Sequence, residues 1–315
     1  MPGKKPIVVV GSINTDLVSI TSRIPSVGET VIGSDFQIHP GGKGANQAVA
    51  VAQLGYPVRL IGRLGNDSFG TQLRKHLVGY GVDIEGVGES EGTSGVAVIV
   101  VSHEGANSIV VTPGANAEVT PQDLEKNIEA IRGAGIVLAQ LEIPLETVVH
   151  LAALCEREGV PLILDPAPAA ELPAEVFRRL TWLTPNQAEA DFYMRRTNGA
   201  GKVHTPAEVA HAILSKGSQG VLLKLGEHGV HIISQAGLDS TLPAFHVTAT
   251  DTTGAGDAFN GGFATGLMLG KSPLASVRFA TAVAAISVTR RGAQPSMPTA
   301  SEVQEFLELE QAIGA

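Results

Sequence analysis

The sequence predicts an α/β fold, in which a mainly parallel sheet is covered by helices on both faces, together with a small additional β-sheet. Short β-branched runs alternate with longer helical patterns along most of the chain, and this alternation is typical of a parallel sheet with crossover helices. Two segments, residues 17–38 and 95–112, instead contain extended runs with no helix between them. We therefore expect one large sheet and a smaller one projecting from it.

The strands of the large sheet are expected where short apolar runs are bounded by Gly, Pro or Asp, because strands buried on both faces have this pattern. Five runs fit it: Ile7–Val10, Val58–Ile61, Ile136–Ala139, Pro161–Leu164 and Val221–Leu225. Nearer the C-terminus, residues 246–249 are expected to be extended and to lead into a loop at residues 250–256.

Three helices are expected to begin at a threonine that stands three residues before an acidic residue, which is the spacing of a capping box. These threonines are Thr120, Thr205 and Thr299, and a proline follows the first two at the first helical position. A helix rich in small residues is expected over residues 258–269, ended by a glycine, and the next helix should run from Ser272 to about residue 290.

The smaller sheet is expected to contain a hairpin, formed by Val96–Val101 and Ser108–Thr112. A sheet with an exposed apolar face usually covers a ligand or a second subunit. We therefore expect a single domain, residues 1–315, with a core of about residues 1–14, 41–94 and 115–315 and a lid of about residues 15–40 and 95–114.

The charge balance argues against a protein that binds nucleic acids or membranes through bulk charge. The 315 residues include 22 Lys and Arg against 31 Asp and Glu, for a net charge of −9. A phosphate site would therefore have to use local backbone donors and a metal. The lone Cys155 excludes an intramolecular disulfide and is expected to be buried in a helix. With no apolar run of 18 residues and no signal-peptide core, we expect a soluble cytoplasmic protein.

The most informative motif is DTTGAGDAFNGG, at residues 251–262. Gly254 and Gly256 allow successive backbone N–H groups to point into one concavity at the start of the following helix, which is an anion site suited to a phosphoryl group. Asp257 in the first turn is placed to take a proton from an attacking hydroxyl. The alternative is that Asp257 only caps the helix.

A second glycine run, PGGKGANQA at residues 40–48, precedes a helix rich in alanine. Asn46 can both donate hydrogen bonds to sugar hydroxyls and accept them. Asn14 and Asp16 follow the first strand, at the sheet edge where α/β proteins bind ligands. These residues predict a polyol pocket. The alternatives are a surface charge for Lys43, a helix cap for Asn46 and a turn residue for Asp16.

Polar residues also follow other expected strands at the same edge of the sheet. They lie in the segments Gln140–Glu142, Asp165–Pro168 and Asn186–Glu189. Each segment could be no more than a polar loop, but their shared position favours a ligand site. The triplet at residues 270–272 is not a P-loop, because Thr265 stands where the first glycine of that motif is required.

Together, the two glycine motifs and the segments at residues 14–16 and 165–168 resemble those of the PfkB-type carbohydrate kinases, and within that family those of the members that phosphorylate ribose. The resemblance extends from residue 11 to residue 296. It implies a three-layer α/β/α core, with a β-sheet lid that also clasps a second subunit in a homodimer. It also implies ATP-dependent phosphorylation of D-ribose at the 5-hydroxyl, which gives D-ribose 5-phosphate.

The resemblance also implies roles for individual residues. The sugar's 5-hydroxyl would lose its proton to Asp257, beside an anion hole made by Gly254, Ala255 and Gly256. Ribose would be held by Asn14, Thr15, Asp16, Gly42, Lys43, Gly44, Ala45, Asn46, Glu142 and Asp257. ATP would be held by Asn186, Glu189, Lys224, Leu225, Gly226, Glu227, His228, Gly229, Gly256, Asp257 and Thr281, with Glu189 also organising Mg²⁺. A monovalent cation, K⁺, would be bound largely through backbone carbonyls by Asp251, Thr253, Ser287, Arg290, Gly292 and Ser296.

The chain departs from the family pattern at Lys224, where similar enzymes carry a small hydroxyl residue. Its side chain either reaches the nucleotide phosphates or points to solvent, and Thr281 also lies at a variable position. Two other functions stay open: a kinase of another sugar or nucleoside on the same fold, and a non-catalytic sugar-binding protein. The second is disfavoured, because Gly254, Gly256 and Asp257 are all present.

Overall fold

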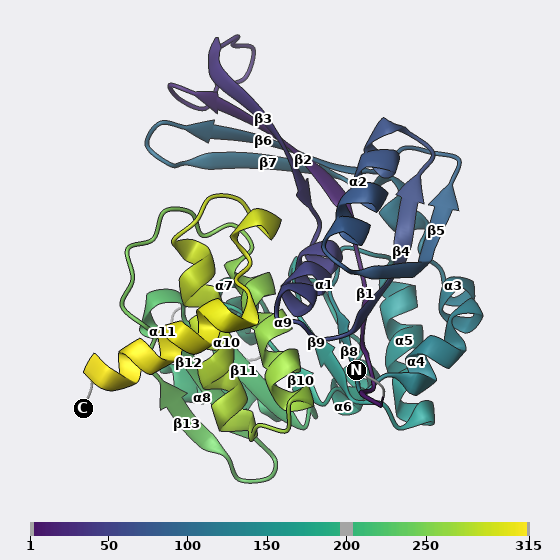
Figure 1. Ribbon diagram of the computed structural model, residues 1–315, viewed down its shortest axis with the longest axis vertical. Helices are drawn as coiled ribbons and strands as arrows, with labels where there is room; N and C mark the ends of the chain where they lie inside the picture. Colours follow the sequence, from purple (N-terminus) through teal and green to yellow (C-terminus); the bar gives the residue numbers. More distant parts are fainter. Residues whose placement is uncertain (1–2, 196–203, 314–315) are drawn as a thin grey trace.

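The computed structural model describes residues 3–195 and 204–313, which form a nine-stranded sheet covered by helices and a separate four-stranded sheet (Figure 1). The strands of the large sheet are β1 (Ile7–Val10), β4 (Val58–Gly65), β5 (Asp83–Ser90), β8 (Ile136–Ala139), β9 (Leu162–Leu164), β10 (Trp182–Leu183), β11 (Gly220–Lys224), β12 (Val230–Ser234) and β13 (Asp239–Leu242). Their order is β13-β12-β11-β10-β9-β8-β1-β4-β5. Neighbours from β5 across to β11 are parallel, whereas β12 pairs antiparallel with both β11 and β13. The predicted, mainly parallel sheet is therefore confirmed.

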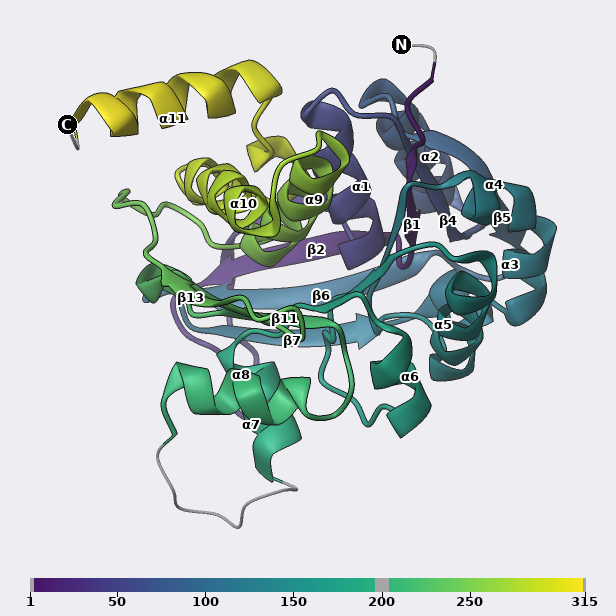
Figure 2. The ribbon, with the colours of Figure 1, turned by 90° about the horizontal axis from the view of Figure 1, so that it is seen from below.

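Helices cover both faces of this sheet and complete three layers. One face carries α1 (Lys43–Gln53), α2 (Ser68–Gly79), α9 (Ala255–Met268), α10 (Pro273–Val288) and α11 (Ala300–Ile313). The other carries α3 (Pro121–Lys126), α4 (Ile128–Gly133), α5 (Leu145–Glu158), α6 (Ala174–Arg179), α7 (Gln187–Arg195) and α8 (Pro206–Leu214). Figure 2 shows α9, α10 and α11 on one side of the sheet and α7 and α8 on the other. Short 3₁₀ helices span Gly114–Glu118, Gly226–His228 and Gln294–Ser296.

Strand β1 explains why the two layers of helices enclose two separate cores. Its four side chains alternate between the faces of the sheet, so that Ile7 and Val9 join one buried cluster while Val8 and Val10 join the other. All four are fully buried. A continuous apolar run therefore gives a strand at the centre of the molecule, as the sequence predicted.

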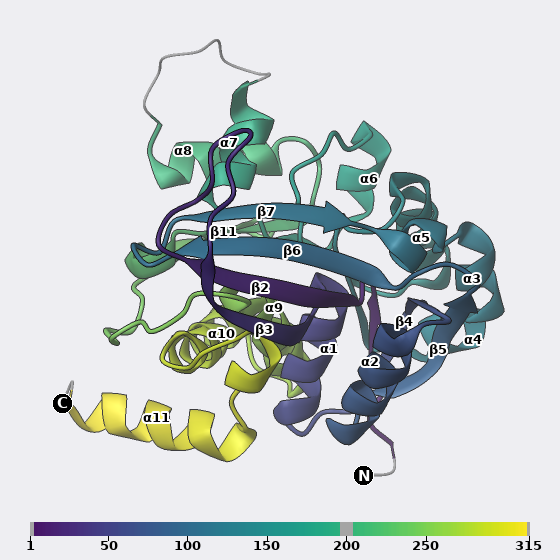
Figure 3. The ribbon, with the colours of Figure 1, turned by 90° about the horizontal axis from the view of Figure 1, so that it is seen from above.

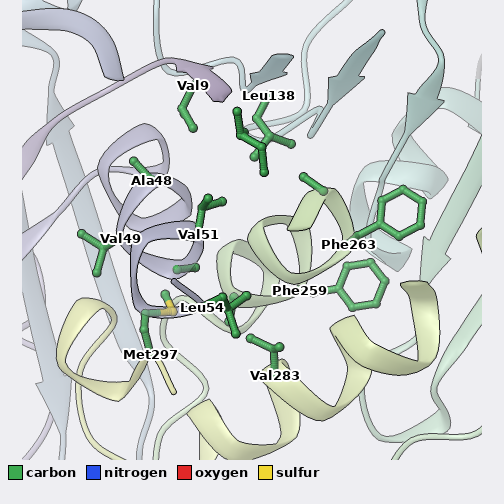
Figure 4. Packing of buried hydrophobic residues seen from close by; sticks show 14 of the residues in the cluster. Val9, Ala48, Val49, Val51, Leu54, Leu138, Phe259, Phe263, Val283 and Met297 are labelled. Carbon is green, nitrogen blue, oxygen red and sulfur yellow. The ribbon is translucent and has the colours of Figure 1, made fainter. Parts of the chain in front are cut away.

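The helices α1, α9 and α10 pack closely beside the predicted site (Figure 4). Phe263 of α9 meets Trp182 edge to face, with ring centroids 5.4 Å apart, and it stacks on Phe259 at 6.4 Å. At Gly261 a side-chain carbon would come within 2.7 Å of Cβ of Ala50 in α1. The small residues therefore allow α1 and α9 to approach each other, and this brings their first turns together.

The second sheet contains β2 (Asn14–Thr21), β3 (Gly33–Gly41), β6 (Gly95–Ser102) and β7 (Asn107–Thr112), in the order β3-β2-β6-β7. Strands β6 and β7 form the predicted antiparallel hairpin, while β2 pairs with β6 in parallel. Figure 3 shows these strands side by side across one end of the core. The predicted small β-sheet is thus present.

Local details agree with the sequence in most places and differ in two. Capping boxes are present at Thr120, Thr205 and Thr299, and Cys155 is buried in α5. The expected extended segment at residues 246–249 forms no strand; the last strand, β13, ends at Leu242, before Pro243, which lacks an N–H for pairing. Helix α9 begins three residues earlier than expected, at Ala255. Among the described residues, no helix is long and apolar enough to cross a membrane.

Candidate active site

The polar segments predicted at one edge of the large sheet lie there in the structure. Glu142 follows β8, Asp165 follows β9, Asn186 follows β10 and Lys224 ends β11. Because these four strands are parallel neighbours, their carboxyl ends meet at the same edge. The first turn of α9 reaches this edge as well, since Lys224 Nζ lies 3.5 Å from the position that a side-chain carbon of Gly256 would occupy.

The start of α9 has the geometry of an anion site. Gly254 precedes the helix with a φ of 75°, in the left-handed region that glycine adopts without strain, and no side chain caps the helix. The N–H groups of Gly256 and Asp257 belong to the first turn, so they have no acceptor within the helix. They are available to an anion, with the helix dipole behind them.

Asp257 is buried at this point, with 4% of its surface exposed. Asn46 Nδ2 donates to its Oδ2 at 2.9 Å and Gln47 Nε2 to its Oδ1 at 3.1 Å. Burial raises the pKa of the Asp257 carboxyl to about 6, opposed by the positive charge of Lys43 and assisted by the negative charge of Asp165. Because its side chain bonds across to α1, the interpretation of Asp257 as a helix cap is wrong.

The second glycine run lets α1 pack directly on the end of β1. Gly42 has a φ of 87°, and a side-chain carbon there would lie 2.6 Å from the backbone nitrogen of Asn14. At Gly44 it would lie 2.6 Å from the carbonyl carbon of Gly11. The first turn of α1 is therefore held against the start of β2, where the predicted ribose residues lie. Six of those residues are buried in this contact region: Asn14, Thr15, Gly42, Gly44, Ala45 and Asn46.

The acidic residues predicted for sugar binding form a charged cluster. Burial, Glu142 and Asp257 raise the pKa of the Asp16 carboxyl to about 6, and Lys43 opposes them. Glu142 Oε2 accepts hydrogen bonds from Ser12 Oγ at 2.5 Å and from the backbone N–H of Lys43 at 3.1 Å. Although burial lowers the pKa of the Lys43 ammonium, Asp257 and other nearby carboxylates raise it above its ordinary value. Lys43 is thus part of the cluster and not a surface charge.

Asn186 and Glu189, predicted on the nucleotide side, bind each other at the start of α7. The backbone N–H and Nδ2 of Asn186 donate to the Glu189 carboxylate at 2.7 and 2.8 Å, and the Glu189 N–H donates to Asn186 Oδ1 at 2.9 Å. Burial and the charge of Asp165 raise the pKa of the Glu189 carboxyl, while Lys224 opposes them. The pair is therefore rigid and lies within reach of the same charges as Asp257.

The other residues predicted for the nucleotide are more spread out. Lys224 lies beside Asn186, with which it forms a parallel β-bridge. The loop at residues 225–229 follows, and residues 226–228 within it are exposed. Thr281 lies on α10, where its hydroxyl donates to the Val277 carbonyl of the same helix at 2.9 Å. The structure therefore brings Lys224 and Asn186 together, whereas the hydroxyl of Thr281 is committed within its own helix.

The residues predicted for a monovalent cation connect two loops behind the start of α9. Asp251 Oδ1 accepts from the Thr253 N–H at 2.9 Å, and Asp251 Oδ2 accepts from the Gly292 N–H at 2.8 Å. Ser287 and Ser296 are buried, and their hydroxyls donate to carbonyls in their own segments. The side chain of Arg290 forms an ion pair with Glu302 at 2.5 Å. Only the backbone carbonyl of Arg290 is therefore left as a ligand for a cation.

This loop fits a hard monovalent cation. The atoms that could ligate the cation are oxygen atoms. The carboxyl end of α10, where the helix dipole is negative, lies beside the loop. Thr250 and Asp251 donate their N–H groups to the Val288 carbonyl at that helix end, at 2.7 and 3.1 Å. Within residues 3–195 and 204–313, no group of three or more His, Cys, Asp or Glu side chains is arranged to hold a metal ion.

Two side chains that hold the site were missed in the sequence. Asn116 Nδ2 donates to Asn14 Oδ1 at 2.7 Å, and Gln294 Nε2 donates to Asn46 Oδ1 at 3.0 Å. The partners are 102 and 248 residues apart in the chain. No local spacing could have revealed contacts over such separations. Gln294 in particular orients the same amide that contacts Asp257.

Comparison with known proteins places this site in a family. Residues 4–300 match the family model described as pfkB family carbohydrate kinase. A ribokinase of Bacillus subtilis is 43% identical over 305 residues, which cover 96% of this chain and 99% of that protein. A deoxyribokinase of Salmonella typhi is 34% identical over 305 residues, which cover 96% and 99% of the two chains.

A solved structure has the same fold over nearly the whole chain. Ribokinase from Arabidopsis thaliana, complexed with ribose and ATP, superposes with a TM-score of 0.89 at 35% identity, covering 97% of this chain and 99% of that one. The sequence match to the family covers nearly the whole chain. It therefore includes both sheets, the anion site at α9 and the polar cluster around Asp257. This protein belongs to the pfkB family of carbohydrate kinases.

Proposed function

We propose that this protein is an ATP-dependent ribokinase that converts D-ribose to D-ribose 5-phosphate. The observation that carries the proposal is Asp257, a buried carboxylate held by Asn46 and Gln47 beside free N–H groups at the start of α9. The relatives support ribose as the acceptor and ATP as the donor. Because the reaction consumes ATP, we expect the protein to act in the cytoplasm.

The chemistry assigned to these residues is an in-line transfer. The 5-hydroxyl oxygen attacks the γ-phosphorus while Asp257 accepts the hydroxyl proton. The bond from the γ-phosphorus to the oxygen bridging the β-phosphorus breaks, and its electron pair stays with ADP. The free N–H groups in the first turn of α9, those of Gly256 and Asp257, stabilise the charge on the phosphoryl oxygens. A pKa of about 6 suits this base, since Asp257 is ionised at neutral pH yet binds a proton more readily than an ordinary aspartate.

The sugar is assigned to the cluster at the ends of β1 and β2. Asp16 and Glu142 would accept hydrogen bonds from ring hydroxyls, and Asn14 and Asn46 would add amide contacts. Lys43 balances the charge of these carboxylates, which lets several acids share one pocket. The pocket therefore recognises a small polyol through charge-assisted hydrogen bonds.

On the nucleotide side, Asn186, the loop at residues 225–229 and Thr281 would line the ATP site. Mg²⁺ would neutralise charge on the β- and γ-phosphates, as in other phosphoryl transfers. Glu189 is the carboxylate suited to orient a water of that ion, because the Asn186 amide already fixes its position. Its raised pKa does not prevent this, since the ion itself favours the charged form.

A bound K⁺ would order the loop residues 251–253 behind the anion site without touching the substrate. The carbonyls of Thr253, Ser287, Arg290, Gly292 and Ser296, with the Asp251 carboxylate, would supply its oxygen ligands. We expect K⁺ to increase the turnover number more than Na⁺ does at equal ionic strength. Equal activity in K⁺, Na⁺ and a large organic cation would refute the assignment.

The first experiment is to measure ATP consumption by the purified protein with Mg²⁺ and K⁺ across ribose, deoxyribose, fructose, adenosine and a blank without acceptor. Preference for ribose supports the proposal. Deoxyribose is the second candidate acceptor, because a deoxyribokinase is 34% identical to this chain over 96% of its length. Activity with only fructose or only adenosine would support a kinase function but would refute ribose as the acceptor.

A further inference from the structure

Lys224 lies at the centre of the site, although its position departs from the family pattern. Its Nζ lies 3.0 Å from Asp165 Oδ1, and 12% of its side chain is exposed. The same nitrogen is 3.5 Å from the position that a side-chain carbon of Gly256 would occupy. The ammonium group therefore lies over the first turn of α9, next to the proposed anion site. The interpretation that it points to solvent is wrong.

The backbone holds the lysine firmly in this place. Its N–H donates to the Pro185 carbonyl at 2.9 Å, and it forms a β-bridge with Asn186. The cation thus projects from the carboxyl end of β11, and the Asp165 carboxylate, which follows β9 two strands away, holds it. A charged group fixed on strand ends is better oriented than one on a free loop.

Asp165 connects this lysine to the proposed base. Gln47 Nε2 donates to Asp165 Oδ2 at 3.2 Å and to Asp257 Oδ1 at 3.1 Å, so one amide group bridges two buried carboxylates. Gln140 Nε2 donates to Gln47 Oε1 at 2.7 Å, which fixes the orientation of that amide. Lys224, Asp165, Gln47 and Asp257 therefore form one continuous chain of polar contacts.

The electrostatics of this chain require a cation at its end. Asp165 and Asp257 are both buried, and two such carboxylates share the donor of a single neutral amide. Their mutual repulsion is offset on the Asp165 side by the ion pair with Lys224. When a triphosphate brings more negative charge to the start of α9, the ammonium is already within reach of it.

We propose that Lys224 is a catalytic residue of phosphoryl transfer and that Asp165 is its positioning residue. This inference rests on the proposed kinase function. The ammonium keeps its proton and donates N–H groups to the γ-phosphoryl oxygens as the bond to the attacking hydroxyl oxygen forms and the bond to the β-phosphate oxygen breaks. Asp257 takes the hydroxyl proton, and the electron pair of the broken bond remains on ADP. Lys224 thus supplements the N–H groups of α9 with a full positive charge.

The test replaces Lys224 by Met, which approximates the aliphatic part of the lysine side chain but lacks the terminal ammonium group. In Lys224→Met we expect kcat to fall on the order of 100-fold, as when one pre-organised donor to a transition state is removed, while KM for ribose changes less than about threefold. Lys75→Met removes an exposed lysine of α2 and is the matched control. Unchanged kcat in a folded Lys224→Met protein overturns the proposal. So does an increase in the KM for ATP alone, because that identifies a nucleotide anchor.

A second measurement does not depend on the sugar. Calorimetric titration of the wild-type protein and Lys224→Met with ATP and with ADP, each with Mg²⁺ and no acceptor, isolates the γ-phosphate. We expect the ratio of ATP to ADP affinity to fall about tenfold in the variant, and an unchanged ratio overturns the proposal. If wild-type protein binds ATP but phosphorylates no sugar, the proposed function fails, while the affinity ratio still decides whether Lys224 contacts the γ-phosphate. Lys224→Leu serves if the Met variant does not fold.

Asp165→Asn tests the positioning role. The amide keeps the shape of the side chain but removes the charge that holds the ammonium, so kcat should fall about tenfold with the KM for ribose retained. In the double variant with Lys224→Met, the loss should not exceed that of Lys224→Met alone, because a residue that acts only through the lysine has no further effect. Multiplicative losses in the double variant refute the positioning role.

Discussion

Asp257 illustrates how a single buried carboxylate can be kept ionised and still act as a base. Burial alone favours the neutral acid, but Asn46 and Gln47 each donate a hydrogen bond to the carboxylate and Lys43 contributes an opposite charge. The balance leaves the pKa at about 6, below neutral pH and above the value of a free aspartate. Each neighbour therefore contributes to catalysis without touching the reacting phosphorus.

Replacement of this carboxylate gives the most direct test of the mechanism. Asp257→Asn keeps the side-chain shape but cannot accept a proton, so kcat should fall by about 10²–10⁴-fold. Ribose affinity, measured by calorimetry, should change less than about threefold. Asp239→Asn, at the half-exposed edge strand β13, is the control and should keep wild-type turnover. Wild-type kcat in Asp257→Asn would exclude this residue as the base.

The pH dependence follows from the two raised carboxyl pKa values. Asp257 and Asp16 both have a pKa of about 6 in the free protein, and both act as acceptors only when ionised. Activity is therefore full above pH 7 and lost as the pH falls through 6, and kcat/KM should decrease about 100-fold between pH 7 and pH 5. In Asp16→Asn one titration is removed, and the same decrease should be about tenfold. A tenfold decrease in both proteins would contradict the assignment.

At this scale, sequence motifs revealed the reactive groups but not what supports them. Asp257 and Asn46 were predicted because each lies next to a glycine run, which is a local signal. Gln47 was visible only as part of the same run, and its contact with Asp165 spans 118 residues. Such contacts depend on how whole elements pack, so no spacing in the chain predicts them.

At the scale of elements, the site depends on the close packing of α1 and α9. Asn46 and Ala50 lie four residues apart on one face of α1, and Asp257 and Gly261 have the same separation on α9, so both pairs lie on the contacting faces. Across the interface, Asn46 donates its hydrogen bond to Asp257, the proposed base. One turn further along, Gly261 faces Ala50 and allows the close approach that makes this bond possible. Packing and catalysis thus share one interface.

Gly261→Ala should separate the two helices. The new methyl group would lie 2.7 Å from Cβ of Ala50 and 3.1 Å from the Gln47 carbonyl oxygen, and overpacking of this kind costs about 1–3 kcal/mol. We expect a lower free energy of unfolding and a lower kcat, measured by denaturant titration and steady-state kinetics. The control is Gly79→Ala, at the end of α2, where no atom lies within 4 Å of the added carbon. It should leave the free energy of unfolding and kcat unchanged. If Gly261→Ala is destabilised but keeps the wild-type kcat, catalysis does not depend on the close packing of α1 and α9.

Element boundaries were predictable where the chain carries its own signals. The three Thr-based capping boxes begin helices in the structure, because their hydrogen bonds are local. The start of α9 was expected too late, since the helix begins at Ala255, directly after the left-handed Gly254 and three residues before the expected start at residue 258. The hairpin of β12 and β13 was not predicted, because an antiparallel pair at the edge of a parallel sheet leaves no distinct local pattern.

At the scale of the whole molecule, the small sheet presents two different faces. Its register aligns Ile38, Leu17, Val98 and Val110 in one row across all four strands. Because successive side chains alternate, Asp16 lies on the opposite face, in a row with His39 and Ala97. One face therefore carries a residue of the active site, while the other carries an apolar row that is largely exposed.

We propose that this apolar row is the contact between two subunits in a homodimer. The exposed fractions are 53% for Ile38, 46% for Val98 and 64% for Val110, and burying such surface in water is favourable at roughly 25 cal/mol per Å². The wild-type protein should therefore have the mass of a dimer in light scattering at micromolar concentration, whereas Val110→Asp should shift it toward the monomer.

The same variant should also affect the sugar site, because β2 carries both Leu17 of the apolar row and Asp16 of the acidic cluster. Without the partner, this strand is held only by its own sheet, so we expect KM for ribose to rise severalfold in Val110→Asp while KM for ATP is retained. Val78→Asp on α2, at a valine outside the sheet that is 57% exposed, is the matched control and should stay dimeric. A monomeric wild-type protein would exclude the dimer. If Val110→Asp is monomeric and its KM for ribose is unchanged, the interface serves only dimer assembly, and ribose binding does not depend on the dimer.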